Sequence, residues 1–314
     1  MAKILCVGQI VADILVRSVD KIDFSIDTKR VDQIVIKNGG DCLNTAIDLK
    51  KLGADVGFCG VLGKDALGKY LQNVLRENGI DDSAIYYDSE ANTSSTVALI
   101  NSEGDRIFLY YGGTNDILSV DKLKMNSLDE ASIVHVGGTF LLPKLDGEGT
   151  RELFEEAHKR GCLTTMDVTY DTTEKWLDII LPCLKELDLF IPSLNEAKRI
   201  CGTDVPNEIA CFLKEKGVKN VILKLGKKGC YVDAFGKSYY QEAFTVPVVD
   251  TTGAGDAFVS GILYGITRGW KIEKTTQFAS AVSAQCIQKL GATAGVVSSD
   301  KTLEFIEKKM KEVQ

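Results

Sequence analysis

The sequence predicts an α/β fold in which helices cover both faces of a mainly parallel sheet, with a small separate β-structure attached. First, short β-branched apolar runs alternate with helical runs through most of the 314 residues, which is the pattern of a parallel sheet covered on both faces. Second, residues 14–36 and 98–111 break this alternation and lack a helical period. Third, a glycine-containing turn near residue 253 follows a β-branched strand and opens a helix.

The composition is that of an ordinary globular protein and narrows the choice of partners. With 45% hydrophobic and 26% charged residues, the chain can form one large core and a small appendage. A formal net charge of -7 repels phosphate backbones, so we expect no nucleic acid partner. Nine cysteines, an odd number without a Cys-x-x-Cys pair, favour reduced thiols over a disulfide framework or a zinc site.

The chain carries no sign of membrane insertion or export. No apolar stretch approaches the roughly 18 residues of a membrane span. The apolar run at residues 4–8 is too short for a signal peptide, and Asp13 and Arg17 follow it in place of a cleavage site. We therefore expect a cytoplasmic protein that does not contact a membrane.

The elements of the parallel sheet follow in order along the chain. Strands are predicted at 4–7 and 56–60, and helices at 42–52 and 69–78, each of which ends at a glycine. The further predicted strands are 133–136, 163–167, 189–191 and 221–225, and the further helices are 149–160, 196–201 and 302–313.

The two irregular regions predict one small sheet that is discontinuous in sequence. Residues 98–100 and 106–111 form a hairpin that turns at Glu103-Gly104, and residues 14–36 alternate strand-like pieces with charges. Such a sheet has free edges and a wet face. A substrate beneath it or a second copy of the chain would cover them, and the edge favours a homodimer.

The most informative segment is the turn Asp250-Thr251-Thr252-Gly253-Ala254-Gly255-Asp256. Glycines let the backbone turn sharply with several N–H groups aligned, and the helix that begins here adds partial positive charge. The amides of Gly253, Ala254, Gly255 and Asp256 therefore predict an anion site. The Asp256 carboxylate either caps the helix or acts as a general base beside the bound anion.

Two common nucleotide motifs are absent here. A dinucleotide fingerprint requires a third glycine where this chain has Phe258, which opposes a nicotinamide dehydrogenase. A P-loop ending at Gly236-Lys237-Ser238 requires a first glycine where the chain has Tyr231.

The segment 250–256 matches the D-T-x-G-A-G-D signature of ribokinase-like (PfkB) carbohydrate kinases, and residues 39–46 and 60–68 resemble the amino-terminal signature of that family. The resemblance extends over residues 4–297. It implies a Rossmann-like three-layer α/β/α domain with a small β-sheet lid, and ATP-dependent phosphorylation of a sugar hydroxyl. The implied kinase domain comprises residues 1–12, 38–91 and 113–314, and the implied lid comprises 13–37 and 92–112.

The resemblance also implies roles for individual residues. Asp256 takes the place of the catalytic base, and the amides of Gly253 to Asp256 that of the anion hole. Asp13 would bind sugar hydroxyls, although a turn or cap residue is the simpler interpretation from the sequence alone. The other implied substrate-pocket residues are Gly39, Gly40 and Asn44.

The nucleotide and metal positions follow from the same resemblance. Lys224, Gly226 and Gly229 lie in a segment that would line the ATP site, with Lys227 facing solvent, and Thr252 is a further expected nucleotide contact. Glu196 would organise Mg²⁺ through water, although Ser193 replaces the asparagine of the family motif.

A monovalent cation site is implied as well. Asp250, Thr252 and the main chain near Gly291 take the positions of K⁺ ligands. Thr252 alternatively does no more than hydrogen-bond the turn, and the sequence leaves these two interpretations equal.

The substrate is less well defined. Arg106 in the lid hairpin could meet a carboxylate or phosphate, but a solvent-facing charge is the simpler expectation. Where related subfamilies carry D-x-N-x-R, this chain has Thr169 and Asp171, which favours a neutral sugar or a nucleoside over an anionic acceptor. A nucleoside kinase and a non-catalytic sugar or nucleotide sensor therefore stay open as alternatives.

Overall fold

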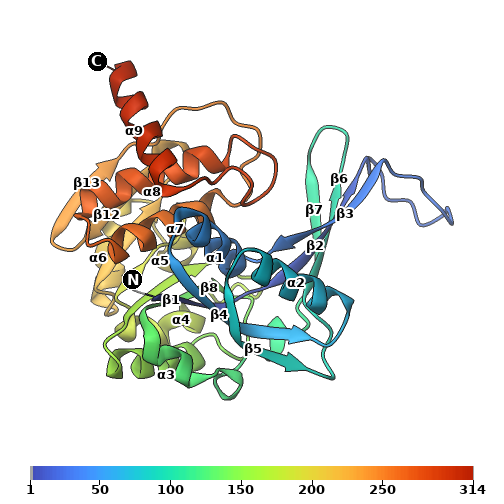
Figure 1. Ribbon diagram of the computed structural model, residues 1–314, viewed down its shortest axis with the longest axis horizontal. Coiled ribbons are helices and arrows are strands. Elements are labelled where there is room, and N and C mark those ends of the chain that lie inside the picture. The colour runs from blue at the N-terminus through green and yellow to red at the C-terminus, as the bar shows by residue number, and fades with distance from the viewer. Residues whose placement is uncertain (1–2, 314) are drawn as a thin grey trace.

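The computed structural model describes residues 3–313, which form a three-layer α/β body with a separate small sheet beside it (Figure 1). The central sheet has nine strands in the order β13-β12-β11-β10-β9-β8-β1-β4-β5. All pairs from β11 through to β5 are parallel, and β12 and β13 form an antiparallel hairpin at one edge. The strands are β1 (Lys3–Gly8), β4 (Asp55–Gly63), β5 (Asp81–Asp88), β8 (Ala131–Thr139), β9 (Leu163–Val168), β10 (Leu189–Phe190), β11 (Asn220–Lys224), β12 (Cys230–Ala234) and β13 (Lys237–Gln241).

Helices cover both faces of this sheet, and each face has its own hydrophobic core. One face is covered by α1 (Asp41–Leu52), α2 (Ala66–Glu77), α7 (Ala254–Thr267), α8 (Ile272–Cys286) and α9 (Ser299–Val313). The other face is covered by α3 (Glu148–Lys159), α4 (Leu177–Ile180), α5 (Leu194–Cys201) and α6 (Pro206–Glu215). The predicted α/β fold is confirmed. None of the described helices has the length and apolarity needed to span a bilayer.

The second sheet has four strands in the order β3-β2-β6-β7 and stands out from the body (Figure 1). Its strands are β2 (Val11–Arg17), β3 (Gln33–Gly39), β6 (Ser95–Ile100) and β7 (Arg106–Tyr111). Asp13 pairs with Lys37 on one side and with Thr96 on the other. The small sheet and its hairpin were predicted; the exact domain boundaries stay a prediction.

The sequence did not predict β5, whose residues Asp81–Asp88 begin and end with carboxylates and are only partly buried. An edge strand of this kind lacks the continuous apolar run of a central parallel strand.

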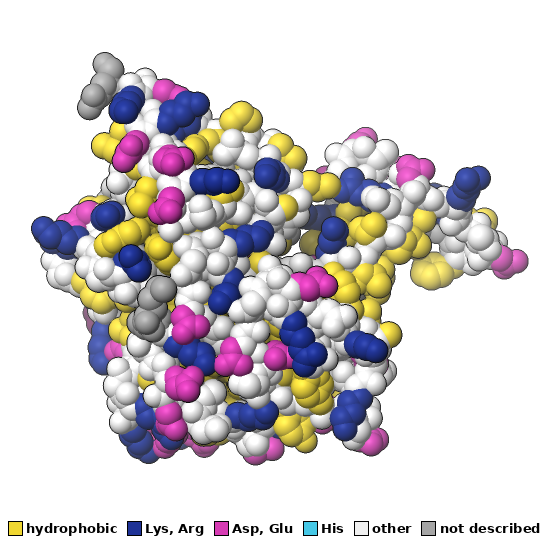
Figure 2. Space-filling model, viewed as in Figure 1, with side chains coloured by type: hydrophobic (Ala, Val, Ile, Leu, Met, Phe, Trp, Pro, Cys, Tyr) yellow, Lys and Arg dark blue, Asp and Glu magenta, His cyan; other side chains and the backbone are white. Residues whose placement is uncertain are grey.

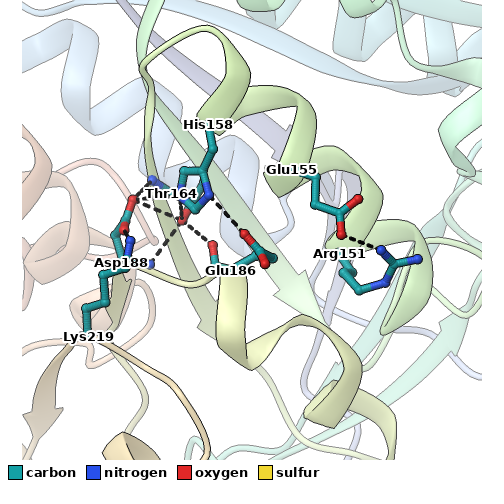
Figure 3. Close-up of polar contacts among 7 residues, drawn as sticks. All are labelled: Arg151, Glu155, His158, Thr164, Glu186, Asp188 and Lys219. Atoms are coloured by element: carbon teal, nitrogen blue, oxygen red, sulfur yellow. Dashed lines mark hydrogen bonds and ion pairs between the residues drawn. The ribbon is translucent and has the colours of Figure 1, made fainter.

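A polar network joins elements at the amino ends of the parallel strands, opposite the edge where a site is expected (Figure 3). The ring of His158, at the end of α3, has Nδ1 3.1 Å from Glu186 Oε2 and Nε2 3.0 Å from Asp188 Oδ2. Lys219 donates to Asp188 Oδ1 at 2.6 Å, and the Thr164 N–H donates to Asp188 Oδ2 at 2.9 Å. Asp188 thus ties α3 to the starts of β9, β10 and β11.

Candidate active site

Two adjoining cavities lie at the carboxyl ends of the parallel strands, which is where open α/β sheets bind ligands. The larger, of about 510 Å³, is mainly polar in its side chains, and the smaller, of about 390 Å³, is mainly apolar. Lys224, Gly226, Thr251, Ala254 and Gly255 line both cavities. The predicted glycine turn therefore separates a polar compartment from an apolar one.

The turn itself requires glycine at Gly253, the N-cap of α7. Its φ is 77°, in the left-handed region, and a Cβ there would lie 2.1 Å from the carbonyl oxygen of Ala292. A side chain would therefore displace the backbone. The Ala254 N–H points back to the Thr251 carbonyl at 3.2 Å. The other residues whose amides were predicted to bind an anion are Gly253, Gly255 and Asp256. They lie at the start of α7 and line the larger cavity.

Asp256 lies in the first turn of α7 and lines the larger cavity. The side-chain amide of Asn44 donates to its Oδ2 at 2.9 Å. Burial raises the pKa of Asp256 to about 7, although the hydrogen bond from Asn44 acts in the opposite direction. A carboxyl group that titrates near neutral pH and borders a cavity has the properties of a general base.

The larger cavity gathers charges that come from distant parts of the sequence. Lys224 Nζ lies 2.5 Å from Asp167 Oδ2, and Asp41 and Glu196 line the same space. Burial raises the pKa of Asp41, Asp167 and Glu196. Lys224 loses hydration through burial, but Asp167 and Glu196 keep its pKa above the ordinary value. With Asp256, four carboxylates thus surround one lysine.

Within residues 3–313, no three His, Cys, Asp or Glu side chains converge closely enough to hold a metal ion by themselves. The carboxylates therefore suit Mg²⁺ bound through retained water and phosphate oxygens. Glu196 Oε2 accepts the Ser193 N–H at 2.7 Å as part of a capping box at the start of α5. Ser193, where the family motif has asparagine, therefore positions Glu196 and leaves its carboxylate at the cavity wall.

The predicted substrate residues come together where the lid meets the core. A Cβ at Gly39 would lie 2.1 Å from Asp13 Oδ2, and one at Gly40, where φ is 93°, would lie 2.8 Å from the Gln9 carbonyl oxygen. Burial raises the pKa of Asp13 to about 6, and a hydrogen bond involving Thr96 opposes the shift. Asn44 completes this group.

The smaller cavity has a mainly apolar wall, as small-molecule sites commonly do. Its apolar lining residues are Ala243, Phe244, Val246, Val248, Ala254, Phe258, Ala284 and Ile287. Gly229 lines it with a φ of 90°, and a Cβ there would lie 1.9 Å from the Gln241 carbonyl oxygen. Lys227 is exposed, as expected, and also borders this cavity.

Thr252 and its neighbours form a series of hydrogen bonds beside the cavities. Thr252 Oγ1 donates to Asp250 Oδ1 at 2.7 Å, and the Gly291 N–H donates to Asp250 Oδ2 at 2.9 Å. Arg106 Nη1 donates to Thr252 Oγ1 at 2.6 Å. Arg106 thus contacts the core through one nitrogen, while its side chain stays exposed, as expected for a lid hairpin. Thr252 itself is not among the residues that line the two cavities, whereas its neighbour Thr251 lines both.

Sequence reasoning missed several residues of the site. Asp41 directly follows Gly39-Gly40, and its place at the first turn of α1 was a usable signal. The ion pair between Lys224 and Asp167 gave no local signal, because the partners are 57 residues apart. Asp171 accepts backbone N–H groups of residues 173, 175 and 176 at 2.6–2.8 Å, so it braces a loop.

The chain is similar to known sugar kinases in sequence and in fold. The model of the pfkB family carbohydrate kinases matches residues 1–299. Fructokinase-1 of Zea mays is 29% identical over 285 residues, which cover 86% of this chain and 88% of that protein. The structure of Arabidopsis thaliana ribokinase complexed with ribose and ATP is similar with a TM-score of 0.84 and 26% identity, over 98% of this chain and 99% of that one. A putative ribokinase II from E. coli, in complex with ATP and Mg²⁺, has a TM-score of 0.81 and 21% identity, over 98% and 100% of the two chains.

Proposed function

Because the chain belongs to the pfkB family of carbohydrate kinases, it is an ATP-dependent sugar kinase, and we propose that its acceptor is a neutral sugar deprotonated by Asp256. The observation that carries the role of Asp256 is its position. The carboxylate is buried, borders the larger cavity and is bonded to Asn44 of the substrate group. This position would let Asp256 reach an acceptor hydroxyl beside the phosphate turn.

The two cavities divide the nucleotide between them. The apolar wall of the smaller cavity suits a nucleoside, and Gly226 and Gly229 permit close approach of the backbone. Phosphates would extend past Lys224 into the larger cavity. Glu196, with Asp41 and Asp167 nearby, would hold Mg²⁺ through water, and the ion would neutralise phosphate charge there.

The residues of the turn act during transfer. Asp256 accepts the proton of the attacking hydroxyl, while Asn44 holds the carboxylate in place. The amides of Gly253, Gly255 and Asp256 and the Lys224 ammonium stabilise the charge on the transferred phosphoryl group; the predicted Ala254 amide is bonded to the Thr251 carbonyl instead. Closing the lid excludes water, which is a competing acceptor.

The charge around the acceptor supports a neutral substrate. Asp13, Asp41 and Asp256 face or adjoin the acceptor side, and a sugar acid would be repelled by them. Asp171 replaces the arginine that related subfamilies carry, and it is bonded to its own loop. Arg106 is engaged by Thr252.

An ADP-release assay tests the proposal with ribose, fructose, ketodeoxygluconate, adenosine, inosine and cytidine as acceptors. We expect activity with ribose or fructose and little with ketodeoxygluconate. Preferred phosphorylation of ketodeoxygluconate would contradict the neutral acceptor. A preference for a nucleoside would support the nucleoside kinase alternative, and tight binding without ADP release would support the sensor.

We also propose that Asp250, Thr252 and the main chain near Gly291 respond to K⁺. Asp250 already joins the two loops concerned, through Thr252 and Gly291, so a cation at its carboxylate would stiffen both. Replacing K⁺ by tetramethylammonium at constant ionic strength should lower turnover, and unchanged turnover would contradict this.

The outer face of the lid supports a homodimer. Alternation along the strands places Ile34, Ile36, Ile107 and Leu109 on the face opposite Asp13. Each is 45–63% exposed, and hydrophobic side chains gather over this region of the surface (Figure 2). An apolar sheet face of this kind is covered in most soluble proteins. Light scattering should give the mass of two chains, and Leu109→Asp should reduce it to one.

We further propose a cytoplasmic location without nucleic acid partners. All nine cysteines are free thiols, seven of them buried, which fits a reducing compartment. The net charge of -7 disfavours phosphate backbones.

A further inference from the structure

Arg106 is the first residue of β7, at the edge of the lid, yet its side chain reaches the core. Its Nη1 donates to Thr252 Oγ1 at 2.6 Å and lies 3.7 Å from Asp250 Oδ1. The guanidinium carbon lies 5.5 Å from the centroid of the Phe108 ring. Since Phe108 is two residues along the same strand, it projects from the same face and supports the arginine in this direction.

The Thr252 hydroxyl stands in the middle of a chain of hydrogen bonds. It accepts from Arg106 and donates to Asp250 Oδ1 at 2.7 Å, to which the Thr252 N–H also donates at 3.0 Å. Asp250 Oδ2 accepts from the Gly291 N–H at 2.9 Å. This series of hydrogen bonds therefore connects the lid to two loops. One contains Asp250 and Thr252 and directly precedes Gly253, where the phosphate turn begins, and the other contains Gly291.

Other polar contacts between the lid and the core lie elsewhere. Asn38 donates to Asn44 at 3.2 Å, and Asn115 donates to Tyr110 at 3.3 Å, both on the acceptor side. Within residues 3–313, the hydrogen bond that a lid side chain makes to the phosphate turn is the one from Arg106 to Thr252. Its side chain remains 39% exposed, so the contact is weak enough to form and break as the lid moves.

We propose that Arg106 is a positioning residue that aligns the phosphate turn when the lid closes over an acceptor. This inference rests on the proposed kinase function. With the lid open, the Asp250 to Gly253 turn loses one of its braces. With the lid closed, Arg106 fixes Thr252, and the amides that follow it point steadily at the transferred phosphoryl group. Acceptor binding and assembly of the anion site then become one event, which limits transfer to water.

Steady-state kinetics separate this role from direct ligand contact. The acceptor is D-ribose or D-fructose, whichever the ADP-release panel shows to be phosphorylated. Arg106→Ala should lower kcat roughly 10- to 100-fold, the scale of a small misplacement of catalytic groups. The KM of the sugar and the Kd of ATP measured without sugar should change less than about twofold. Millimolar guanidinium should restore part of the lost kcat, and Arg106→Lys should retain part of it.

Arg30→Ala is a matched control, because it removes the same charge from an exposed position in the loop between β2 and β3. It should leave kcat unchanged. A rise in sugar KM at constant kcat for Arg106→Ala would make the residue a sugar contact, and a weaker Kd for ATP alone would make it a phosphate contact. Either result would overturn the positioning role.

Hydrogen exchange provides a readout without turnover. In the native enzyme, the same sugar without nucleotide should protect the amides of residues 250–256 from exchange, and in Arg106→Ala this protection should disappear. Equal protection in both proteins would overturn the inference. A native enzyme that phosphorylates no acceptor would contradict the proposed function itself, so the two failures are distinguishable.

Discussion

Replacing Asp256 by Asn should abolish most of the activity and, above neutral pH, stabilise the fold. The amide has nearly the same shape and can still accept the hydrogen bond that Asn44 donates at 2.9 Å. It cannot take a proton from the acceptor hydroxyl. Since a positioned general base contributes about 10²- to 10⁴-fold, kcat should fall by that factor, equivalent to roughly 3–5 kcal/mol of barrier.

The stability effect follows from the buried carboxyl. Its pKa is 3.8 in an unfolded chain and about 7 in the folded protein, because burial disfavours the charged form. The folded state therefore holds a proton that the unfolded chain releases, and the native protein loses stability as pH rises from about 4 to about 7. Asn carries no such penalty. At pH 8 the variant should be more stable by a few kcal/mol, on the scale of about 1.4 kcal/mol per pH unit.

Urea unfolding at pH 5 and pH 8, with ADP release measured at pH 6 to 9, tests both effects on the same protein. The kcat/KM of the native enzyme should fall below about pH 7 as Asp256 of the free enzyme is protonated, and the stability difference between the two proteins should grow with pH. If Asp256→Asn retains kcat within tenfold of the native value, the carboxylate is not the base. If its stability advantage is the same at both pH values, the buried carboxyl is not the cause.

Three further substitutions follow from the geometry. Gly253→Ala should cost at least 1–3 kcal/mol in urea unfolding and most of the activity, because the new Cβ meets the Ala292 carbonyl oxygen at 2.1 Å; normal turnover would show that the turn adapts. His158→Ala should lower the free energy of unfolding by about 1–3 kcal/mol without changing kcat, because it leaves Asp188 without one of its donors (Figure 3); an unchanged urea midpoint would contradict this. Lys224→Met should destabilise the fold by about 3–5 kcal/mol, since buried carboxylates lose their cation, and the loss should be smaller at pH 5 than at pH 8.

The parts of the site that depend on local backbone conformation could be predicted from the sequence. Gly253 and Gly40 adopt positive φ values in the positions where the motifs require a turn, and their residue type alone indicates this. The strand-like run from residue 14 predicted the small sheet, but the pairing of Asp13 with Lys37 and Thr96 was not predicted. The features that were predicted need information from only a few neighbouring residues.

The contacts that set the chemistry depend on strand order, which the sequence pattern does not specify. Asp167 is the next-to-last residue of β9 and Lys224 is the last of β11. They meet because only the two-residue strand β10 lies between these strands in the parallel sheet. The bond from Arg106 to Thr252 joins residues 146 apart and depends on how the lid sits over the core. A charged residue in a hairpin looks solvated unless that placement is known.

The buried carboxylates of the larger cavity destabilise the fold, but their charge also favours binding of a cation. Burial raises the pKa of Asp41, Asp167, Glu196 and Asp256, and neighbouring carboxylates add to the shift for Asp41, Glu196 and Asp256. Such an arrangement costs folding stability. The same cluster attracts a divalent cation, and neutralising the neighbouring carboxylates would lower the pKa of Asp256. Binding of the metal–nucleotide complex would thereby ionise the base at the stage when an acceptor hydroxyl has to be deprotonated.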